Sequence, residues 1–326
     1  MKKIFITGGA GYVGSKLVPK LLELGYGATV LDLMIYGENV LDDHEKLKKI
    51  KGDIRNESLL KKIIPGHDIV IHLACISNDP SFELNPSLGK SINFDAFEPL
   101  VKVSLESKVR RFIYASSSSV YGIKKEKNVT EDMRLEPLTD YSKFKADCEK
   151  ILNNYKSEDF ITTTIRPSTV CGYAKRQRLD LVVNILTNHA YHNREIKVFG
   201  GDQLRPNVHI DDMVNSYLAL LDAPSKKING EIFNVGFKNQ TVNELAEDVK
   251  DVIGHDVKII KMKSDDNRSY HVSSEKIKQI LSFKTKYTVK DAVLDLKNEF
   301  EKKSLTNTFE DEFFFNIKRM NNINLV

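Results

Sequence analysis

The sequence predicts an α/β fold, with a doubly wound parallel sheet followed by a smaller α+β lobe. Short apolar runs alternate with amphipathic stretches of helical length between residues 3 and 165. Four of the 17 glycines fall between residues 8 and 14, directly after the first apolar run. Strands that alternate with helices imply a parallel sheet that is covered by helices on both faces.

The alternating elements can be placed from their apolar periods and from the glycine or proline residues that stop them. Helices are expected over residues 12–24, 57–64, 91–107 and 141–155. Buried strands are expected over residues 3–7, 28–31, 48–52, 68–74, 112–115 and 161–165. Because the strands are parallel, their carboxyl ends lie at one edge of the sheet, and each crossover between them is expected to be right-handed.

The pattern loosens after Arg166-Pro167 and predicts an irregular second lobe. Helices are expected over residues 179–190, 211–221, 242–252, 275–281 and 289–302, and strands over 196–199, 231–235 and 257–260. We assign residues 1–170 to the sheet domain and 171–303 mainly to the second lobe, some segments of which can return to the sheet. Residues 304–326 are rich in Asn and Phe without a clear period, and are either a docked or a partly ordered tail.

Composition narrows the class of protein. The chain has 326 residues, with 49 Lys and Arg against 45 Asp and Glu, so its net charge of +4 does not indicate a nucleic-acid partner. Cys75, Cys148 and Cys171 lack the spacing of a metal or redox site and are expected to be reduced thiols. The first apolar run is too short for a signal peptide, and no run is long enough to cross a membrane. A cytoplasmic protein without a metal is expected.

The glycine cluster predicts a dinucleotide site. It lies between a strand and a helix, as a phosphate-binding turn requires. Gly8 allows the tight turn, Gly11 lets the backbone approach a pyrophosphate, and Gly14 lets the helix pack on the strand. Tyr12 and Val13 begin the helix, whose free N–H groups favour phosphate. The alternative is a glycine-rich turn that binds nothing.

Asp32 supports the same interpretation, because it ends the second strand about 20 residues after the glycines, where a carboxylate accepts from ribose hydroxyls. No Lys or Arg occurs in residues 33–39 to bind a 2′-phosphate. The expected cofactor is therefore NAD rather than NADP. The alternative is that Asp32 is an ordinary surface carboxylate.

A second group of residues predicts proton-transfer chemistry. Tyr141 and Lys145 stand four apart on a predicted helix and so share a face. A neighbouring Lys⁺ lowers the pKa of a phenol, which would make Tyr141 a general base. Such spacing is common by itself, but a serine run at residues 116–119 leaves the fifth strand at the edge where ligands bind.

Taken together, these motifs resemble the extended short-chain dehydrogenase/reductases of the NAD-dependent epimerase/dehydratase family, which act on nucleotide sugars. The resemblance spans about residues 3–300 and makes the sheet a Rossmann-type domain and the second lobe a substrate lobe. It rests on Thr7-Gly8-x-x-Gly11-x-x-Gly14, Asp32, Gly52-Asp53-Ile54, His72-Leu73-Ala74, Asn93, the serine run, Tyr141-x-x-x-Lys145, Arg166-Pro167 and Arg205-x-x-Val208-His209-x-Asp211-Asp212.

The resemblance implies roles for the matching residues. Ser117 would hold the sugar oxygen while Tyr141 moves the proton, and Lys145 would also bind the nicotinamide ribose. The other implied cofactor residues are Asp53, Ile54, Leu73, Ala74, Asn93 and Pro167. Arg205 and Arg268 resemble arginines that clamp the substrate pyrophosphate, a task that suits the planar guanidinium.

Departures from the family pattern narrow the expected reaction. Family members that dehydrate or decarboxylate carry an acid just after the catalytic hydroxyl, where this chain has Ser118-Ser119. Members that epimerise at C3 and C5 have a cysteine where Ser119 stands. We therefore expect NAD-dependent redox at C4 of a nucleotide-diphosphate sugar, most simply a 4-epimerase. The alternatives are a 4-dehydrogenase or 4-ketoreductase, then a 4,6-dehydratase, and lastly a non-enzymatic NAD-binding regulator.

Weaker signals concern the substrate and the assembly. The segment Arg176-x-Arg178-Leu179-Asp180 and the following residues resemble a subgroup tied to bacterial surface polysaccharides, some of whose members act on heptoses or deoxysugars. Asn78, Ser118, Arg178 and Asn184 are candidate substrate contacts, against structural roles in turns and helices. The family usually forms homodimers through two helices, here 91–107 and 141–155, with Phe97, Val101 and Tyr155 as candidate interface residues.

Overall fold

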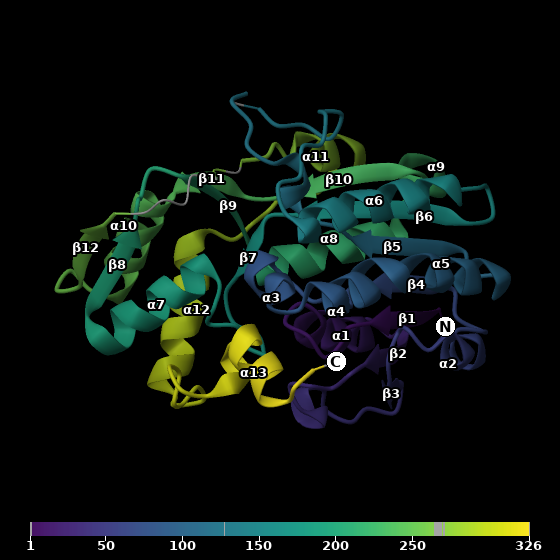
Figure 1. Cartoon of the computed structure of the whole chain (residues 1–326), viewed down its shortest axis with the longest axis horizontal. Coiled ribbons are helices and arrows are strands. Elements are labelled where there is room, and N and C mark those ends of the chain that lie inside the picture. Colours follow the sequence, from purple (N-terminus) through teal and green to yellow (C-terminus); the bar gives the residue numbers. More distant parts are fainter. Residues whose placement is uncertain (1, 127, 264–268, 270, 326) are drawn as a thin grey trace.

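The computed structural model describes residues 2–126, 128–263, 269 and 271–325 (Figure 1). Its largest unit is a seven-stranded sheet in the order β10-β6-β5-β4-β1-β2-β3, in which all neighbours pair in parallel. The strands are β1 (Lys3–Thr7), β2 (Gly27–Asp32), β3 (Leu47–Lys51), β4 (Ile69–His72), β5 (Arg111–Ala115), β6 (Ile161–Pro167) and β10 (Glu231–Val235). The predicted doubly wound sheet is confirmed, and β10 returns to it from the second lobe.

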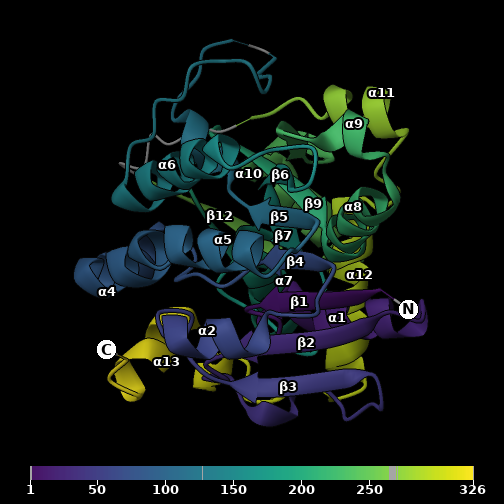
Figure 2. The same ribbon diagram turned by 90° about the vertical axis from the view of Figure 1, so that its right-hand side faces the viewer.

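Helices cover both faces of this sheet, as Figure 2 shows. Ile4 and Ile6 of β1 share a buried cluster with α1 (Gly14–Glu23) and α8 (Ile210–Asp222). Phe5, which points to the opposite face, shares another with α2 (Glu57–Ile63), α5 (Phe97–Glu106) and α6 (Asp140–Asn154). Because side chains alternate along a strand, one apolar run supplies both cores.

The second lobe has its own core between α7 (Val182–Asn193), α10 (Val242–Ile253) and α12 (Val289–Glu301). Two small sheets accompany it. One pairs β11 (Lys238–Thr241), β9 (Leu204–His209) and β7 (Thr169–Cys171), and the other pairs β12 (Lys258–Met262) with β8 (Glu195–Phe199). The sequence does not predict β7, β9 or β11, because these strands are short, polar or contain Pro206. Helices α9 (Ser225–Ile228) and α11 (Glu275–Leu281) flank β10.

The segment after β4 is more helical than predicted. It forms α3 (Asp79–Leu84), α4 (Pro86–Lys90) and a π-helical turn, Ser91–Asp95, before α5. Asparagine side chains cap both short helices, since Asn78 and Asn85 accept from the N–H groups of Ser81 and Leu88. A single predicted helix over 91–107 was therefore wrong in its first turn.

The tail is docked. It contains α13 (Asn316–Asn322), whose Met320 is buried against the sheet domain. Short 3₁₀ turns occur at Glu38–Val40, Ser118–Tyr121 and Glu312–Phe314. Among the helices described, none is both long and apolar enough to cross a membrane.

A buried ion pair joins α6 to the sheet. Glu149 on α6 accepts from Arg166 on β6 at 2.6 Å and 3.0 Å, and both side chains are less than 5% exposed. Ser116, at the end of β5, donates to the same carboxylate. Arg166 also donates to the hydroxyl of Tyr121 at 2.7 Å. The pair therefore ties together the helix and the strand ends that carry the predicted catalytic residues.

Glu149→Ala is expected to lower the free energy of unfolding by about 3–5 kcal/mol, because it leaves the Arg166 guanidinium buried without its counter-ion. The matched control is Asp147→Ala on the same helix, whose partner Lys150 is exposed, and which should cost less than about 1 kcal/mol. Urea unfolding measures both. Equal losses for the two variants would show that the buried pair has no special weight.

Candidate active site

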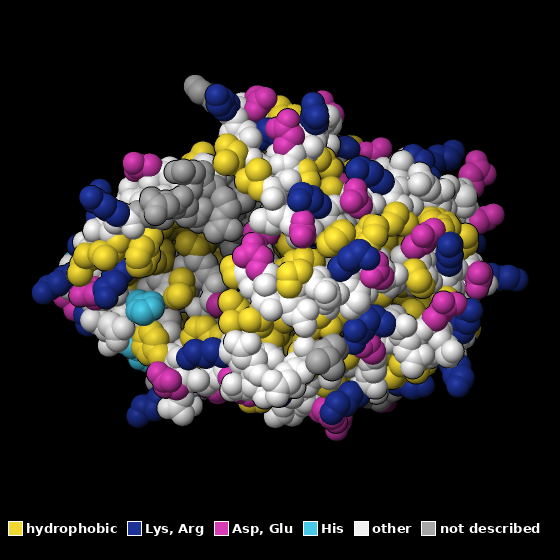
Figure 3. All heavy atoms as spheres, viewed as in Figure 1, with side chains coloured by type: hydrophobic (Ala, Val, Ile, Leu, Met, Phe, Trp, Pro, Cys, Tyr) yellow, Lys and Arg dark blue, Asp and Glu magenta, His cyan; other side chains and the backbone are white. Residues whose placement is uncertain are grey.

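A cavity of about 530 Å³ lies along the carboxyl edge of the sheet, with walls from the sheet domain and the second lobe. This volume is typical of small-molecule sites. Figure 3 shows the surface hollowed between the two parts, with charged side chains of both signs interspersed around it. Predicted residues that line the cavity are Gly8, Gly11, Tyr12, Val13, Gly14, Asp32, Asp53, Ile54, Leu73, Ala74, Asn78, Ser117, Ser118, Tyr141, Lys145, Pro167, Arg178 and Arg205.

The glycine turn has the steric features of a phosphate cradle. A Cβ on Gly8, whose φ is +72°, would lie 2.5 Å from the backbone nitrogen of Ala74. A Cβ on Gly14 would lie 2.3 Å from the carbonyl oxygen of Gly9. No side chain caps α1, and its first turn contains no acidic residue. The glycines therefore leave room for a phosphate group to approach the backbone at the start of the helix, and the residues fit a dinucleotide.

Asp32 is held by the backbone beside this turn. Its carboxylate accepts from the N–H of Ala10 at 2.9 Å and from the N–H of Met34 at 2.8 Å, one bond on each oxygen. Burial raises the pKa of Asp32, and these two hydrogen bonds oppose that rise. Each oxygen retains a lone pair, so the carboxylate can still accept from ribose hydroxyls.

Arg176, which belongs to a predicted motif but was assigned no role of its own, approaches the same end of the cavity. The Arg176 guanidinium lies 3.5 Å from the centre of the Tyr36 ring, and both residues line the cavity. Residues 33–39 contain no Lys or Arg, and the cation near Asp32 instead comes from the second lobe. The Arg176-x-Arg178 pattern was the available signal.

The three predicted catalytic residues meet in the cavity. Lys145 donates to the carbonyl of Ala115 at 2.7 Å, and its Nζ lies 5.8 Å from the centre of the Tyr141 ring. The expectation of a lowered tyrosine pKa is wrong in this structure. Burial raises the pKa of Tyr141, the negative charge of Asp79 adds to that rise, and the backbone N–H of Asn78 opposes it.

A chain of hydroxyl groups orients Ser117. Its oxygen accepts from the N–H of Ser119 at 3.1 Å and lies 2.9 Å from the Ser119 hydroxyl. The chain continues to Ser142 at 2.8 Å and Thr139 at 3.0 Å, and Thr139 donates to Asp79 at 2.5 Å. When Ser119 donates to Ser117, the Ser117 hydroxyl keeps its own hydrogen for a ligand oxygen.

Two predicted contacts have structural roles instead. The amide of Asn93 exchanges two hydrogen bonds with the backbone of Ile76, at 2.8 and 2.9 Å, and so shapes the loop after β4. Asn184 is fully buried, accepts from the N–H of Gly172, and donates to the hydroxyl of Tyr12 and the carbonyl of Arg178. Neither asparagine lines the cavity, so the expected cofactor and substrate contacts are corrected.

The remaining candidate substrate residues differ in how far their polar groups are already used by other parts of the protein. Arg178 donates to Asp180 at 2.8 Å and to the hydroxyl of Ser77 at 3.1 Å, while its Nη2 has no hydrogen-bond partner within the described part of the chain. The oxygen of Asn78 is used as the cap of α3. Arg205 lines the cavity from β9. Arg268 lies outside the described residues.

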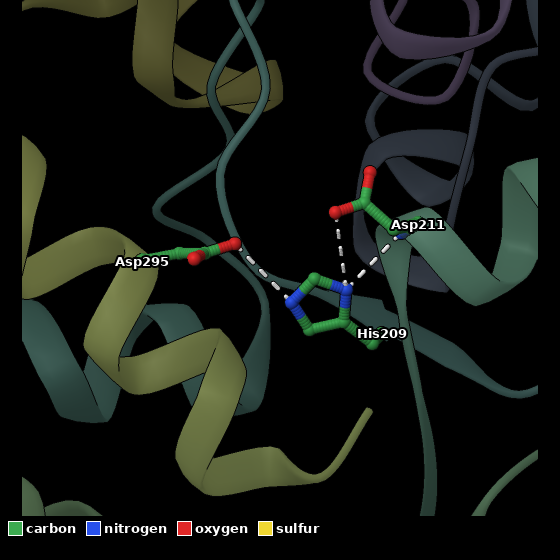
Figure 4. Close-up of side chains that lie close together, drawn as sticks. All are labelled: His209, Asp211 and Asp295. Atoms are coloured by element: carbon green, nitrogen blue, oxygen red, sulfur yellow. Dashed lines mark hydrogen bonds and ion pairs between the residues drawn. The ribbon is translucent and has the colours of Figure 1, made fainter. Parts of the chain in front are cut away.

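His209, which belongs to the family-like motif, is a structural residue. Its Nδ1 accepts from the N–H of Asp211 at 3.1 Å and so caps α8, and its Nε2 lies 3.3 Å from Asp295 (Figure 4). The ring also lies 4.8 Å from that of Tyr287. The side chains of His209, Asp211 and Asp295 lie close enough together to surround a cation. The capping hydrogen bond, however, occupies the His209 Nδ1 that faces Asp211.

A parallel sheet whose glycine turn and tyrosine–lysine helix open into one cavity is the architecture of an enzyme that uses a dinucleotide. Comparison with family models makes this specific. The chain belongs to the NAD dependent epimerase/dehydratase family, whose model matches residues 4–236. It is therefore an NAD-dependent enzyme.

Similar proteins support the family assignment along most of the chain. A UDP-glucose 4-epimerase from Lactobacillus helveticus is 28% identical and covers 90% of this chain and 94% of its own length. A UDP-N-acetyl-alpha-D-glucosaminuronate decarboxylase from Bacillus cytotoxicus is 28% identical and covers 79% and 83%. The crystal structure of UDP-glucose 4-epimerase from Thermotoga maritima with UDP-glucose has a TM-score of 0.84 at 25% identity, covering 93% of this chain and all of that one.

One residue at this edge makes stability depend on pH. His72 at the end of β4 lies 2.7 Å from the Thr7 hydroxyl, and burial, followed by the charge of Lys145, lowers its pKa from 6.5 to about 3. The unfolded chain therefore binds a proton below about pH 6.5 that the folded protein excludes. Stability is complete above that pH and falls as the pH drops toward 3.

Between about pH 7 and pH 5, the protein should lose roughly 2 kcal/mol more unfolding free energy than His72→Asn, which has no imidazole to titrate. Urea unfolding at the two pH values gives the difference, and the exposed His44→Asn serves as control. Identical losses in wild type and His72→Asn would contradict the assigned burial effect.

Proposed function

We propose that this protein is a nucleotide-sugar 4-epimerase that acts on a UDP-hexose through a 4-keto intermediate. The observation that carries the proposal is that Ser117, Tyr141 and Lys145 line the same cavity as the glycine turn. The UDP-hexose is proposed because the relatives from Lactobacillus helveticus and Thermotoga maritima are named UDP-glucose 4-epimerases.

In this proposal the dinucleotide lies along the glycine turn. Asp32 accepts from its ribose, Asp53 and Ile54 border its adenine, Leu73 and Ala74 line its path, and Lys145 and Pro167 border its nicotinamide end. Bound NAD supplies the acceptor, and later the donor, of the C4 hydride. The remaining chemistry belongs to this chain's own residues.

Tyr141 and Ser117 handle the oxygen on C4. Oxidation removes a hydride from C4 and a proton from its hydroxyl, and Tyr141 accepts that proton as its phenolate, a form that the positive charges of Lys145 and of the bound nicotinamide would favour against the effect of burial. Ser117 donates a hydrogen bond to the same oxygen, which requires the Ser119 hydroxyl to donate to Ser117. The reverse transfer, after the keto sugar has presented its other face, returns the proton and inverts the configuration at C4.

Absence of an acid directly after Ser117 favours this simple redox cycle over dehydration. Ser118 and Ser119 occupy those positions, and Ser119 is engaged with Ser117 and Ser142. The two arginines on the lobe side, Arg178 and Arg205, are proposed to bind the substrate diphosphate and sugar. A 4-dehydrogenase or 4-ketoreductase uses the same residues but releases the ketone or the alcohol.

We also propose a cytoplasmic homodimer that forms through α5 and α6. Two of the expected interface residues are unsuitable, since Phe97 and Val101 are fully buried within the protomer. Phe94 and Phe144 are better candidates, because they are partly exposed and their rings stack with centres 5.0 Å apart. Hydrophobic side chains show at the surface over these helices in Figure 3.

The reaction type can be tested by product analysis. The purified protein with NAD is expected to convert UDP-galactose to UDP-glucose until equilibrium, without net NADH accumulation at 340 nm, because the hydride returns to the sugar. Chromatography of the nucleotide sugars measures the conversion. One NADH formed for each sugar consumed would instead identify a 4-dehydrogenase, and loss of water from the sugar a dehydratase.

Tyr141→Phe should lower kcat by roughly 10²- to 10⁴-fold, because it removes the group that accepts the proton. NAD affinity should remain close to wild type, since the cofactor turn is untouched. Steady-state kinetics and calorimetry separate the two effects, with Tyr173→Phe in the second lobe as a matched control. A variant with wild-type kcat would exclude Tyr141 from the chemistry, and a chain without turnover in either form would fit a regulator.

A further inference from the structure

The C-terminal tail forms part of the cavity wall. Asn316 and Met320, one helical turn apart on α13, both line the cavity that holds the glycine turn and Asp32. Arg319 donates to the carbonyl of Ile35, in the loop after β2, and so holds the helix there. Figures 1 and 2 show α13, in yellow, beside the sheet domain although it comes last in the chain.

Asn316 is the centre of the contact. It is 4% exposed, and its side-chain oxygen accepts from the Tyr36 hydroxyl at 2.8 Å and from Arg176 Nη2 at 2.6 Å. Its side-chain nitrogen donates to the Ser77 hydroxyl at 3.0 Å, and its backbone N–H donates to Asp180 at 3.0 Å. One tail residue thus joins two loops of the sheet domain to the second lobe.

Arg176 is fixed in place but not satisfied. It is 4% exposed, stacks on Tyr36, and its backbone N–H donates to the hydroxyl of Ser15 in the first turn of α1. Its Nε and Nη1 have no hydrogen-bond partner among the residues that the structure describes. Burial lowers the pKa of Arg176 to about 10, and the nearby Arg178 adds to the lowering. Buried N–H groups of a cation are costly when unpaired, so these two groups point to a ligand with oxygen acceptors.

We propose that the tail completes the adenosine end of the NAD site: Asn316 holds Arg176 so that its free N–H groups bind the adenosine ribose and the adjoining phosphate. The inference rests on the proposed placement of NAD along the glycine turn. Asn316 is a positioning residue that acts through Arg176, and its consequence is slow release of the cofactor. Met320 closes the cavity wall beside it.

The residues around Arg176 indicate which end of the dinucleotide it would bind. The charge of Arg176 lowers the pKa of Asp32, although burial has the larger and opposite effect. Asp32 is the carboxylate that is proposed to bind the adenosine ribose. Ser15 lies in the helix turn that faces the pyrophosphate. A guanidinium between these two residues can donate hydrogen bonds to a ribose hydroxyl oxygen and to a phosphate oxygen.

Asn316→Ala is expected to raise the Kd of the full-length protein for NADH about 10-fold, and to speed NADH release by a similar factor, because Arg176 loses the bond that holds it. NADH fluorescence during displacement by excess NAD measures both. ADP-ribose, which has the adenosine end but no nicotinamide, should lose affinity by the same factor. The affinity for UDP should not change.

The matched control is Asn321→Ala, an exposed asparagine on the same helix, which should bind NADH as wild type does. A change below about threefold in both NADH and ADP-ribose affinity for Asn316→Ala would overturn the proposal. Equal losses for UDP and NADH would also overturn it, because they indicate general loosening rather than a defect at the adenosine end.

Arg176→Met provides a second route if Asn316→Ala does not fold. It should weaken NADH and ADP-ribose at least as much, and adding Asn316→Ala to it should cause no further loss, since the tail acts through the arginine. Additive losses would overturn that link. These binding measurements do not depend on epimerase turnover, so a failure of the proposed reaction is distinguished from a failure of the tail's role.

Discussion

The buried ion pair between Glu149 and Arg166 is the contact on which the proposed catalytic arrangement depends. Helix α6 carries Tyr141 and Lys145, whereas Ser117 follows β5, so contacts in space must fix these parts relative to one another. The Glu149 carboxylate accepts hydrogen bonds from Arg166 on β6 and from Ser116 at the end of β5, so one charged group positions the helix relative to two strands. Such a pair is costly to bury and costly to break, which favours a single geometry over neighbouring ones.

The second constraint is the topology of the sheet. The chain runs outward from β1 to β2 and β3, then returns to place β4 on the other side of β1. A crevice opens at such a reversal, and here the Gly8 turn meets the backbone of Ala74 there, too closely for any side chain on Gly8. The position of the cavity therefore follows from strand order, whereas its far wall comes from the second lobe and the tail.

Much of this could be predicted from sequence because it is local. One element, or two neighbouring elements, contain each of the features that were predicted: the apolar runs, the glycine turn, Asp32 and the Tyr141–Lys145 pair. The predictions failed where long-range contacts decide the outcome. Asn184 was expected to contact the substrate, yet both polar atoms of its amide are hydrogen-bonded within the protein. Arg176 and Asn316 are 140 positions apart and show their joint role only when folding brings them together.

The central claim is that one cavity holds NAD and a UDP-hexose with the sugar C4 facing Tyr141 and Ser117. A crystal structure of the protein with NAD and UDP-glucose tests this claim most directly. The account predicts a dinucleotide along residues 8–14, and the O4 atom of the sugar within hydrogen-bond distance, about 2.6–3.2 Å, of the Tyr141 and Ser117 hydroxyls. A sugar bound with another carbon at these two residues, or a dinucleotide bound elsewhere, would contradict it.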